Sequence, residues 1–210
     1  MTSDLLPMIA AERRRIADLI DSLTPEQLAT PSLCGEWTVQ EVAGHLAVPF
    51  LVPQWRFLPL ILRSGFSLHA ANARLAREVG RRPAGGLAAA LRSHAEHPLR
   101  PPVVGHPGQL TDLQVHGQDI RRPLGLPGDL HPDPLRVSLD FLVGGRAIGF
   151  IDRRWIAGLR FEATDLDWSA GAGPLVRGPG EAVLLALTGR RVVLPELTGD
   201  GVAVLAGRGT

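Results

Sequence analysis

Two short segments, far apart in the sequence, carry side chains that could bind a metal ion. The first begins at Cys34 and leads to His45, and the second contains Asp112 and His116. Asp112 and His116 are four residues apart, so on a helix both side chains leave the same face one turn apart. His45 would complete the set from another helix. Two imidazoles and one carboxylate suit zinc or another divalent first-row ion, and they leave coordination positions open.

Each of these residues also has a plainer interpretation. A single histidine such as His45 on an apolar helix is usually a buried, hydrogen-bonded core residue. An Asp and a His four residues apart, such as Asp112 and His116, are often a surface pair. An open metal position can hold a water for hydrolysis as well as a thiol. From the residues alone, hydrolysis and thiol activation remain equal candidates.

A family resemblance favours the metal interpretation. The tracts that carry it are residues 33–46 (LCGEWTVQEVAGHL), residues 112–125 (DLQVHGQDIRRPLG), and residues 163–168 followed by 186–190. In spacing, order and flanking residues they resemble the mycothiol-dependent maleylpyruvate isomerase family, a branch of the DinB-like four-helix metalloproteins. The resemblance implies a mainly α fold, in which a DinB-like up-down four-helix bundle is followed by a small α+β C-terminal domain.

The resemblance also implies a function. His45, Asp112 and His116 would be the metal ligands, with zinc expected first and nickel, iron or manganese as alternatives. Mycothiol would be the cosubstrate, and the enzyme would be a cis-trans isomerase or a thiol transferase acting on a small electrophilic, carboxylate-bearing substrate. The family usually has Glu where this chain has Asp112, so the carboxylate here reaches about one methylene less far. A non-catalytic, regulatory metal-binding protein and a metal-dependent hydrolase are the alternatives.

Arg190 is the candidate substrate-binding residue. It follows a predicted short helix, and by resemblance its guanidinium could hold a substrate carboxylate through two hydrogen bonds. The alternative is a solvated arginine after a helix end. We expect the bundle to span residues 1–156 and the C-terminal domain to span residues 157–210.

Composition restricts the remaining choices. The 22 basic residues, all arginine, against 21 acidic ones give a net charge of +1, which indicates no nucleic-acid or anionic-membrane partner. A single cysteine excludes an intrachain disulfide. The start of the chain lacks the pattern of a signal peptide, and the longest apolar stretch is broken by prolines and polar residues. We therefore expect a cytoplasmic protein without a membrane span, and a homodimer is compatible with the sequence.

The periodicity of apolar residues predicts the elements. Thr38 and Glu41 form a capping box, so a helix should begin there and hold His45 two turns inside. Prolines 49, 53 and 59 should kink or break the helical segment after His45. The other predicted helices are 5–23, the short turn 24–28, 87–96, 109–124, 133–152 and 179–188, and the predicted strands are 159–164 and 202–205.

Several further residues could take part in chemistry. Cys34 could be a catalytic thiol or a metal ligand, but the sequence suggests neither a nearby base nor a second cysteine, so we interpret it as a packing residue in the loop before the capped helix. Asp119 could accept a hydrogen bond from an imidazole or be a solvated charge, and the sequence favours neither. His94 and His97 should lie at a helix C-terminus. The remaining histidines lie beside loop signals and are interpreted as surface residues, with His106 a further candidate to support the metal site: His69, His106 and His131.

Overall fold

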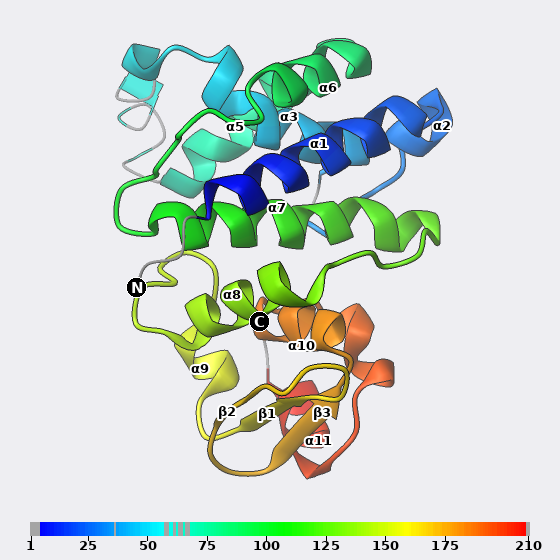
Figure 1. Ribbon diagram of the computed structural model, residues 1–210, viewed down its shortest axis with the longest axis vertical. Coiled ribbons are helices and arrows are strands. Elements are labelled where there is room, and N and C mark those ends of the chain that lie inside the picture. Colours follow the sequence, from blue (N-terminus) through cyan, green and yellow to red (C-terminus); the bar gives the residue numbers. More distant parts are fainter. Residues whose placement is uncertain are drawn as a thin grey trace. The chain divides into compact units, whose positions relative to one another are not determined.

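The computed structural model describes residues 5–35, 37–56, 59–60, 62, 65 and 68–208 (Figure 1). Contacts group the chain into two compact units, Met1–Pro98 with His116–Pro127 and Leu99–Val115 with Gly128–Thr210. This grouping divides helix α7, whose residues fall in both units. The domain boundary expected between residues 156 and 157 stays a prediction, because grouping by contacts places the helix before it with the C-terminal unit.

The first unit is helical. Helix α3 packs on α5 and α6, and α1 packs on α6. Trp37, Val42 and Ile120 belong to its buried apolar cluster. The helices of this unit are α1 Leu6–Ser22, α2 Pro25–Leu28, α3 Val39–Leu51, α5 Leu68–Gly80, α6 Ala84–Ser93 and the C-terminal part of α7 Gly105–Arg121.

Helix α3 begins as the sequence predicts. The hydroxyl of Thr38 accepts a hydrogen bond from the amide of Glu41 at 3.2 Å, and the Glu41 carboxylate accepts one from the Thr38 amide at 3.0 Å. The capping box is therefore confirmed. The helix passes through Pro49 and ends at Leu51, shortly before Pro53. His45 is consequently held on a rigid element.

Helices α3 and α5 approach backbone to backbone at Gly44, the residue before His45. A Cβ added at Gly44 would lie 2.6 Å from the Gly80 nitrogen and 2.7 Å from the Ala76 carbonyl oxygen. Gln40, one turn earlier on α3, donates to the Gly80 carbonyl at 2.6 Å. Only glycine fits at this crossing, so the close contact fixes the position of α3, the helix that carries His45, along and around its axis relative to α5.

Arg13 ties α1 to the end of α6. Its guanidinium is buried and donates to the carbonyls of His94, Ala95 and His97 at 2.7–2.8 Å. Burial lowers the pKa of Arg13 to about 10, so the group remains charged at neutral pH. It lies 5.0 Å from the centre of the Phe50 ring, on which the His94 ring stacks. His94 is the C-cap residue of α6, as predicted, whereas His97 lies three residues beyond the cap.

The second unit combines helices with a small sheet. Strand β1 lies in the middle of the order β2-β1-β3, pairing antiparallel with β2 and parallel with β3. The core is formed by α10, in which every residue except Glu181 is buried, against the sheet and α8. The elements are α8 Pro132–Val143, α9 Arg153–Ile156, β1 Arg160–Ala163, β2 Ser169–Gly171, β3 Leu175–Gly178, α10 Gly180–Leu187 and α11 Asp200–Gly207. A mainly α fold with a small α+β part is thus confirmed.

Three sequence predictions of elements were wrong or incomplete. Residues 202–205 form helix α11 rather than a strand, because Gly201 and Leu205, four apart, are buried on one helical face. Helix α8 ends at Val143 rather than at residue 152, because Gly144 and Gly145 follow it. Helix α5 was not predicted, although its buried residues Leu75, Ala76 and Val79 have helical spacing.

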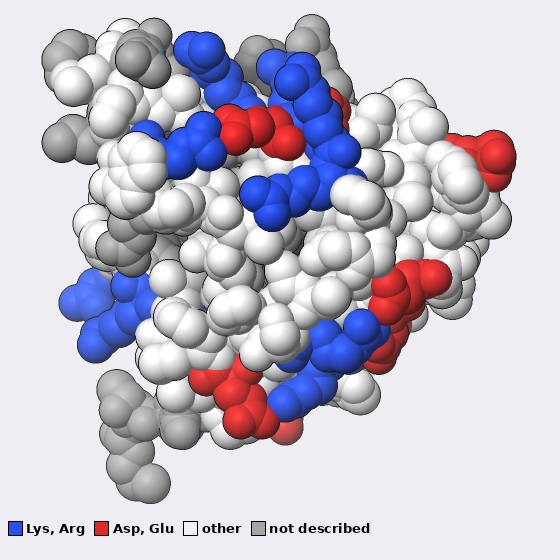
Figure 2. Space-filling model, turned by 90° about the horizontal axis from the view of Figure 1, so that it is seen from above, with Lys and Arg blue, Asp and Glu red and all other residues white. Residues whose placement is uncertain are grey.

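The surface in Figure 2 carries both signs of charge, with arginine side chains beside acidic ones on the face shown. Among the helices of the described ranges, none is both long and apolar enough to cross a bilayer.

Replacing Gly44 with alanine tests the crossing of α3 and α5. Alanine has the higher helix propensity, but its Cβ would collide with backbone atoms of α5 that cannot rotate away. We expect Gly44→Ala to lower the free energy of unfolding by about 1–3 kcal/mol in denaturant titrations. Gly86→Ala is the matched control, since its Cβ would meet open space, and it should stabilise α6 by about 0.5–1 kcal/mol. A stabilising Gly44→Ala would contradict the close crossing.

Candidate metal centre

Helix α7 carries most of the residues of the candidate site. Asp112, His116 and Asp119 recur at steps of four and three residues, so they lie on one face of this helix. On another side, Gly117 faces Ile16 of α1, where an added Cβ would be 3.9 Å from the isoleucine side chain. The α1 side chain therefore lies at van der Waals distance from α7 on this side.

The three residues expected to bind a metal lie together. One ligand atom each from His45, Asp112 and His116 can be chosen so that all lie within 4.8 Å of one another. The His45 and His116 rings are 4.8 Å apart between centroids and inclined by 70°. A tetrahedral ion with ligand bonds of about 2.0–2.2 Å would need donor atoms about 3.3–3.6 Å apart. Rotamer adjustments of about 1 Å would close this set around an ion.

Asp119 accounts for the orientation of His116. Its carboxylate is fully buried, and its Oδ2 lies 2.9 Å from His116 Nδ1, while the His116 side chain is 12% exposed. An ionised carboxylate can only accept, so Nδ1 carries the proton and Nε2 is the nitrogen available to an ion. Of the two interpretations of Asp119, the structure supports the imidazole acceptor and rules out the solvated charge.

The turn before α3 approaches the same place. The Trp37 ring lies 5.3 Å from the His45 ring and 6.3 Å from the His116 ring, measured between centroids. Half-buried Cys34 packs against the apolar cluster, as the sequence interpretation has it. Its sulfur, however, lies within 4.8 Å of donor atoms of both His116 and Asp119. The sequence does not reveal this proximity, because 82 residues separate Cys34 from His116 and no local pattern links them.

The chemistry of the donor set fits a divalent first-row cation. It offers two imidazole nitrogens and one carboxylate oxygen, the combination found in catalytic sites that keep an open position. The His116–Asp119 pair reproduces the carboxylate–histidine arrangement that fixes metal-binding imidazoles.

Three further candidate residues, Arg190, His131 and His106, belong to the second unit. Arg190 follows α10 and donates from Nη1 to the Thr188 carbonyl at 2.8 Å. His131 is exposed, as expected, whereas His106 is half-buried and its Nε2 atom is fully buried. The side chain of His69 lies outside the described residues.

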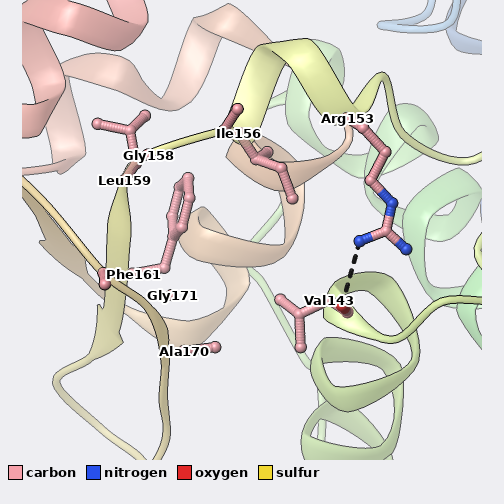
Figure 3. A pocket seen from close by; sticks show the side chains of 10 residues that line it. Val143, Arg153, Ile156, Gly158, Leu159, Phe161, Ala170 and Gly171 are labelled. Atoms are coloured by element: carbon pink, nitrogen blue, oxygen red, sulfur yellow. Dashed lines mark hydrogen bonds between the residues drawn. The ribbon is translucent and has the colours of Figure 1, made fainter.

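A separate hollow of about 270 Å³ lies within the second unit (Figure 3). Phe161 and Ile156 contribute apolar walls, and Arg153 is the only charged residue among those that line it. The Arg153 guanidinium donates to the Val143 carbonyl at the end of α8, as Figure 3 shows. The residues that line this hollow offer no group of acids, bases or metal donors.

Comparison with known proteins supports the resemblance. Residues 9–58 match the family model described as the mycothiol maleylpyruvate isomerase N-terminal domain. Two curated proteins of Mycobacterium tuberculosis, the uncharacterized protein MT0763 of strain CDC 1551 / Oshkosh and the uncharacterized protein Rv0738 of strain ATCC 25618 / H37Rv, are each 25% identical over 188 residues. Each alignment covers 83% of this chain and 84% of the relative.

A solved structure shares the fold. The crystal structure of the mycothiol-dependent maleylpyruvate isomerase superposes with a TM-score of 0.50 at 14% sequence identity, covering 94% of this chain and 90% of that one. At this identity the likeness is one of fold. The predicted resemblance and the predicted fold class are both confirmed.

The role of Asp119 can be tested by an isosteric change. Asp119→Asn keeps the volume but removes the charge that holds the Nδ1 proton of His116, so the affinity for a divalent metal should fall about 10- to 100-fold. Isothermal titration with Zn²⁺ or Mn²⁺ measures this. Asp133→Asn makes the same change at an exposed position on α8 and should leave the affinity unaltered. Equal metal affinities in the two variants would show that Asp119 does not support metal binding by His116.

Proposed function

We propose that this chain is a metal-dependent, mycothiol-using enzyme that catalyses cis-trans isomerisation like the maleylpyruvate isomerases, or transfers the thiol to a related electrophile. The observation that carries the proposal is the convergence of His45, Asp112 and His116, with His116 held by buried Asp119. The match of residues 9–58 and the shared fold support mycothiol as the thiol and cis-trans isomerisation as the reaction type.

The proposed metal would be held by His45 and His116 through nitrogen and by Asp112 through oxygen. A divalent cation there would favour the thiolate form of a bound thiol at neutral pH. The protein contributes the orientation of the ligands. Asp119 keeps the Nδ1 proton of His116 in place, so Nε2 stays deprotonated. The close contact of Gly44 with α5 fixes the position of the backbone that carries His45.

The proposed reaction requires no net change in atoms. The thiolate adds to one carbon of the cis double bond, and the π electron pair moves to the neighbouring carbon as an enolate of the adjacent carbonyl, which leaves a carbon–carbon single bond that can rotate. Return of this electron pair expels the same thiolate and restores the double bond in the trans arrangement. In transfer by addition, the enolate carbon would instead take a proton from solvent, and the carbon–sulfur bond would be kept.

Asp112 stands where the family that this chain resembles usually has glutamate. Aspartate is shorter than the usual glutamate by one methylene, and α7 nevertheless brings its carboxylate within 4.8 Å of the histidine donors. We therefore propose that the α7 backbone lies close enough to the histidines for the shorter side chain to reach the ion.

Activity assays with purified protein test the proposal. Maleylpyruvate should isomerise only when both mycothiol and a divalent metal are present, and a chelator should abolish turnover. Asp112→Ala should lower both the metal content and kcat/KM. The fall in kcat/KM should exceed the roughly 10- to 100-fold that is typical when a residue supporting a metal ligand is lost. Asp133→Asn is the control and should match the unaltered protein.

The alternatives give different results in the same assays. Consumption of a substrate without any thiol would favour a metal-dependent hydrolase. Bound metal with four protein ligands and no turnover of any electrophile would favour a regulatory, non-catalytic protein. Full activity in metal-free protein would overturn the proposal.

Arg190 is proposed to bind the substrate carboxylate. Loss of one charge-assisted hydrogen bond costs about 1.5–3 kcal/mol, so Arg190→Ala should raise KM for a carboxylate substrate roughly 10- to 150-fold with metal content unchanged. Arg190→Lys should recover part of this loss, since the charge is kept and the bidentate geometry is not. Arg177→Ala removes an exposed arginine paired with Glu162 and serves as the control. Unaltered kinetics in Arg190→Ala would reduce Arg190 to a structural residue.

A further inference from the structure

We propose that the chain has a second cation site, formed by Cys34, His116 and Asp119, which takes thiophilic ions such as Cd²⁺. Because it uses His116, it competes with the His45–Asp112–His116 site. The second set contains a sulfur donor and the first does not. This inference concerns ion binding and does not depend on the catalytic proposal.

The geometry of the three donors is close to that of an ion site. The Cys34 sulfur, a His116 ring nitrogen and an Asp119 oxygen lie within 4.8 Å of one another. The nearest nitrogen–oxygen pair, His116 Nδ1 and Asp119 Oδ2, is 2.9 Å apart. Tetrahedral sites with bonds of about 2.0–2.3 Å place their donors about 3.3–3.8 Å apart. A change of about 1 Å in the position of the thiol, together with a widening of the nitrogen–oxygen pair by about 0.4 Å, would therefore complete the set.

The backbone holds Cys34 in place on a closed turn. The Ser32 amide donates to the Trp37 carbonyl at 2.8 Å, and the Trp37 amide donates to the Cys34 carbonyl at 3.2 Å. The Ser32 hydroxyl accepts from the Cys34 amide at 3.1 Å. The thiol is thus presented by a folded turn.

The same turn is joined to α7 beside the proposed ligands. The Leu33 amide donates to the backbone carbonyl of Asp119 at 3.2 Å. The residue before the thiol is therefore bonded to the residue that supplies the carboxylate. Because this bond joins the two segments directly, the sulfur-to-carboxylate separation does not depend on a long or exposed connection.

The charge of the site also suits a cation. The Asp119 side chain is fully buried, and His116 is 12% exposed. A cation bound between the Asp119 carboxylate and a Cys34 thiolate would balance the negative charges of these two ligands. Thiolate ligands select soft ions, whereas nitrogen and oxygen sets accept harder ions such as Mn²⁺.

Proton accounting makes the two sites mutually exclusive. In the first site, the neutral His116 keeps its proton on Nδ1 and would use Nε2. In the second, Nδ1 binds the ion, the imidazole proton moves to Nε2, and the Cys34 thiol proton is released to solvent. A neutral imidazole has only one nitrogen available at a time. The chain should therefore bind one ion in total, and a thiophilic ion should displace a harder one.

Cadmium titration tests the second site in buffer free of added thiols. The sulfur-to-cadmium charge-transfer absorption reports Cys34 alone, because the chain has one cysteine. In the unaltered protein the band should saturate at one equivalent. Cys34→Ser should abolish it, Asp112→Ala should retain it, and Asp119→Asn should weaken Cd²⁺ binding at least about 10-fold. A missing band in the unaltered protein, or equal Cd²⁺ affinity in Asp119→Asn, would overturn the proposal.

Manganese binding, followed by electron paramagnetic resonance, separates the two sites. Mn²⁺ binding should survive in Cys34→Ser and be lost in Asp112→Ala, and Cd²⁺ should displace Mn²⁺ one for one in the unaltered protein. Simultaneous binding of both ions would disprove the shared His116. If Mn²⁺ binding fails while the Cd²⁺ results hold, the first site is wrong and the second stands.

Discussion

The contact between His116 Nδ1 and Asp119 Oδ2 is the interaction on which the site depends. It places a fully buried carboxylate 2.9 Å from an imidazole, which determines where the imidazole proton resides. Without it the ring could rotate, and either nitrogen could be presented. The backbone carbonyl of Asp119 also receives the Leu33 amide, so the same residue connects α7 to the turn before α3. One residue thus orients a ligand and joins two segments of the chain.

The other half of the site depends on a close approach of backbones. Gly44 allows α3 to lie against the end of α5, and the capping box of Thr38 and Glu41 fixes where α3 begins. His45 follows Gly44 directly, so its position is set by contacts that involve little side-chain freedom. This arrangement meets the general requirement that a metal site be built on rigid elements whose supporting contacts are satisfied.

The sequence predicted what local patterns and the family resemblance encode. The capped start of α3 was predicted from Thr38 and Glu41, and the shared face of Asp112 and His116 from their spacing. The proximity of Cys34 to His116 could not be predicted in this way, because it depends on how a turn folds back onto a helix 82 residues later. Four-residue apolar runs are ambiguous between helix and strand, which is why residues 202–205 were assigned wrongly.

The central claim is that His45, Asp112 and His116 together hold a divalent ion. Anomalous diffraction from crystals of the Mn²⁺-loaded protein tests it most directly. We predict one peak about 2.0–2.3 Å from a nitrogen of His45, an oxygen of Asp112 and Nε2 of His116, allowing for the ion's slightly longer bonds than zinc. A manganese peak away from His45, or one bound to Nδ1 of His116, would contradict it.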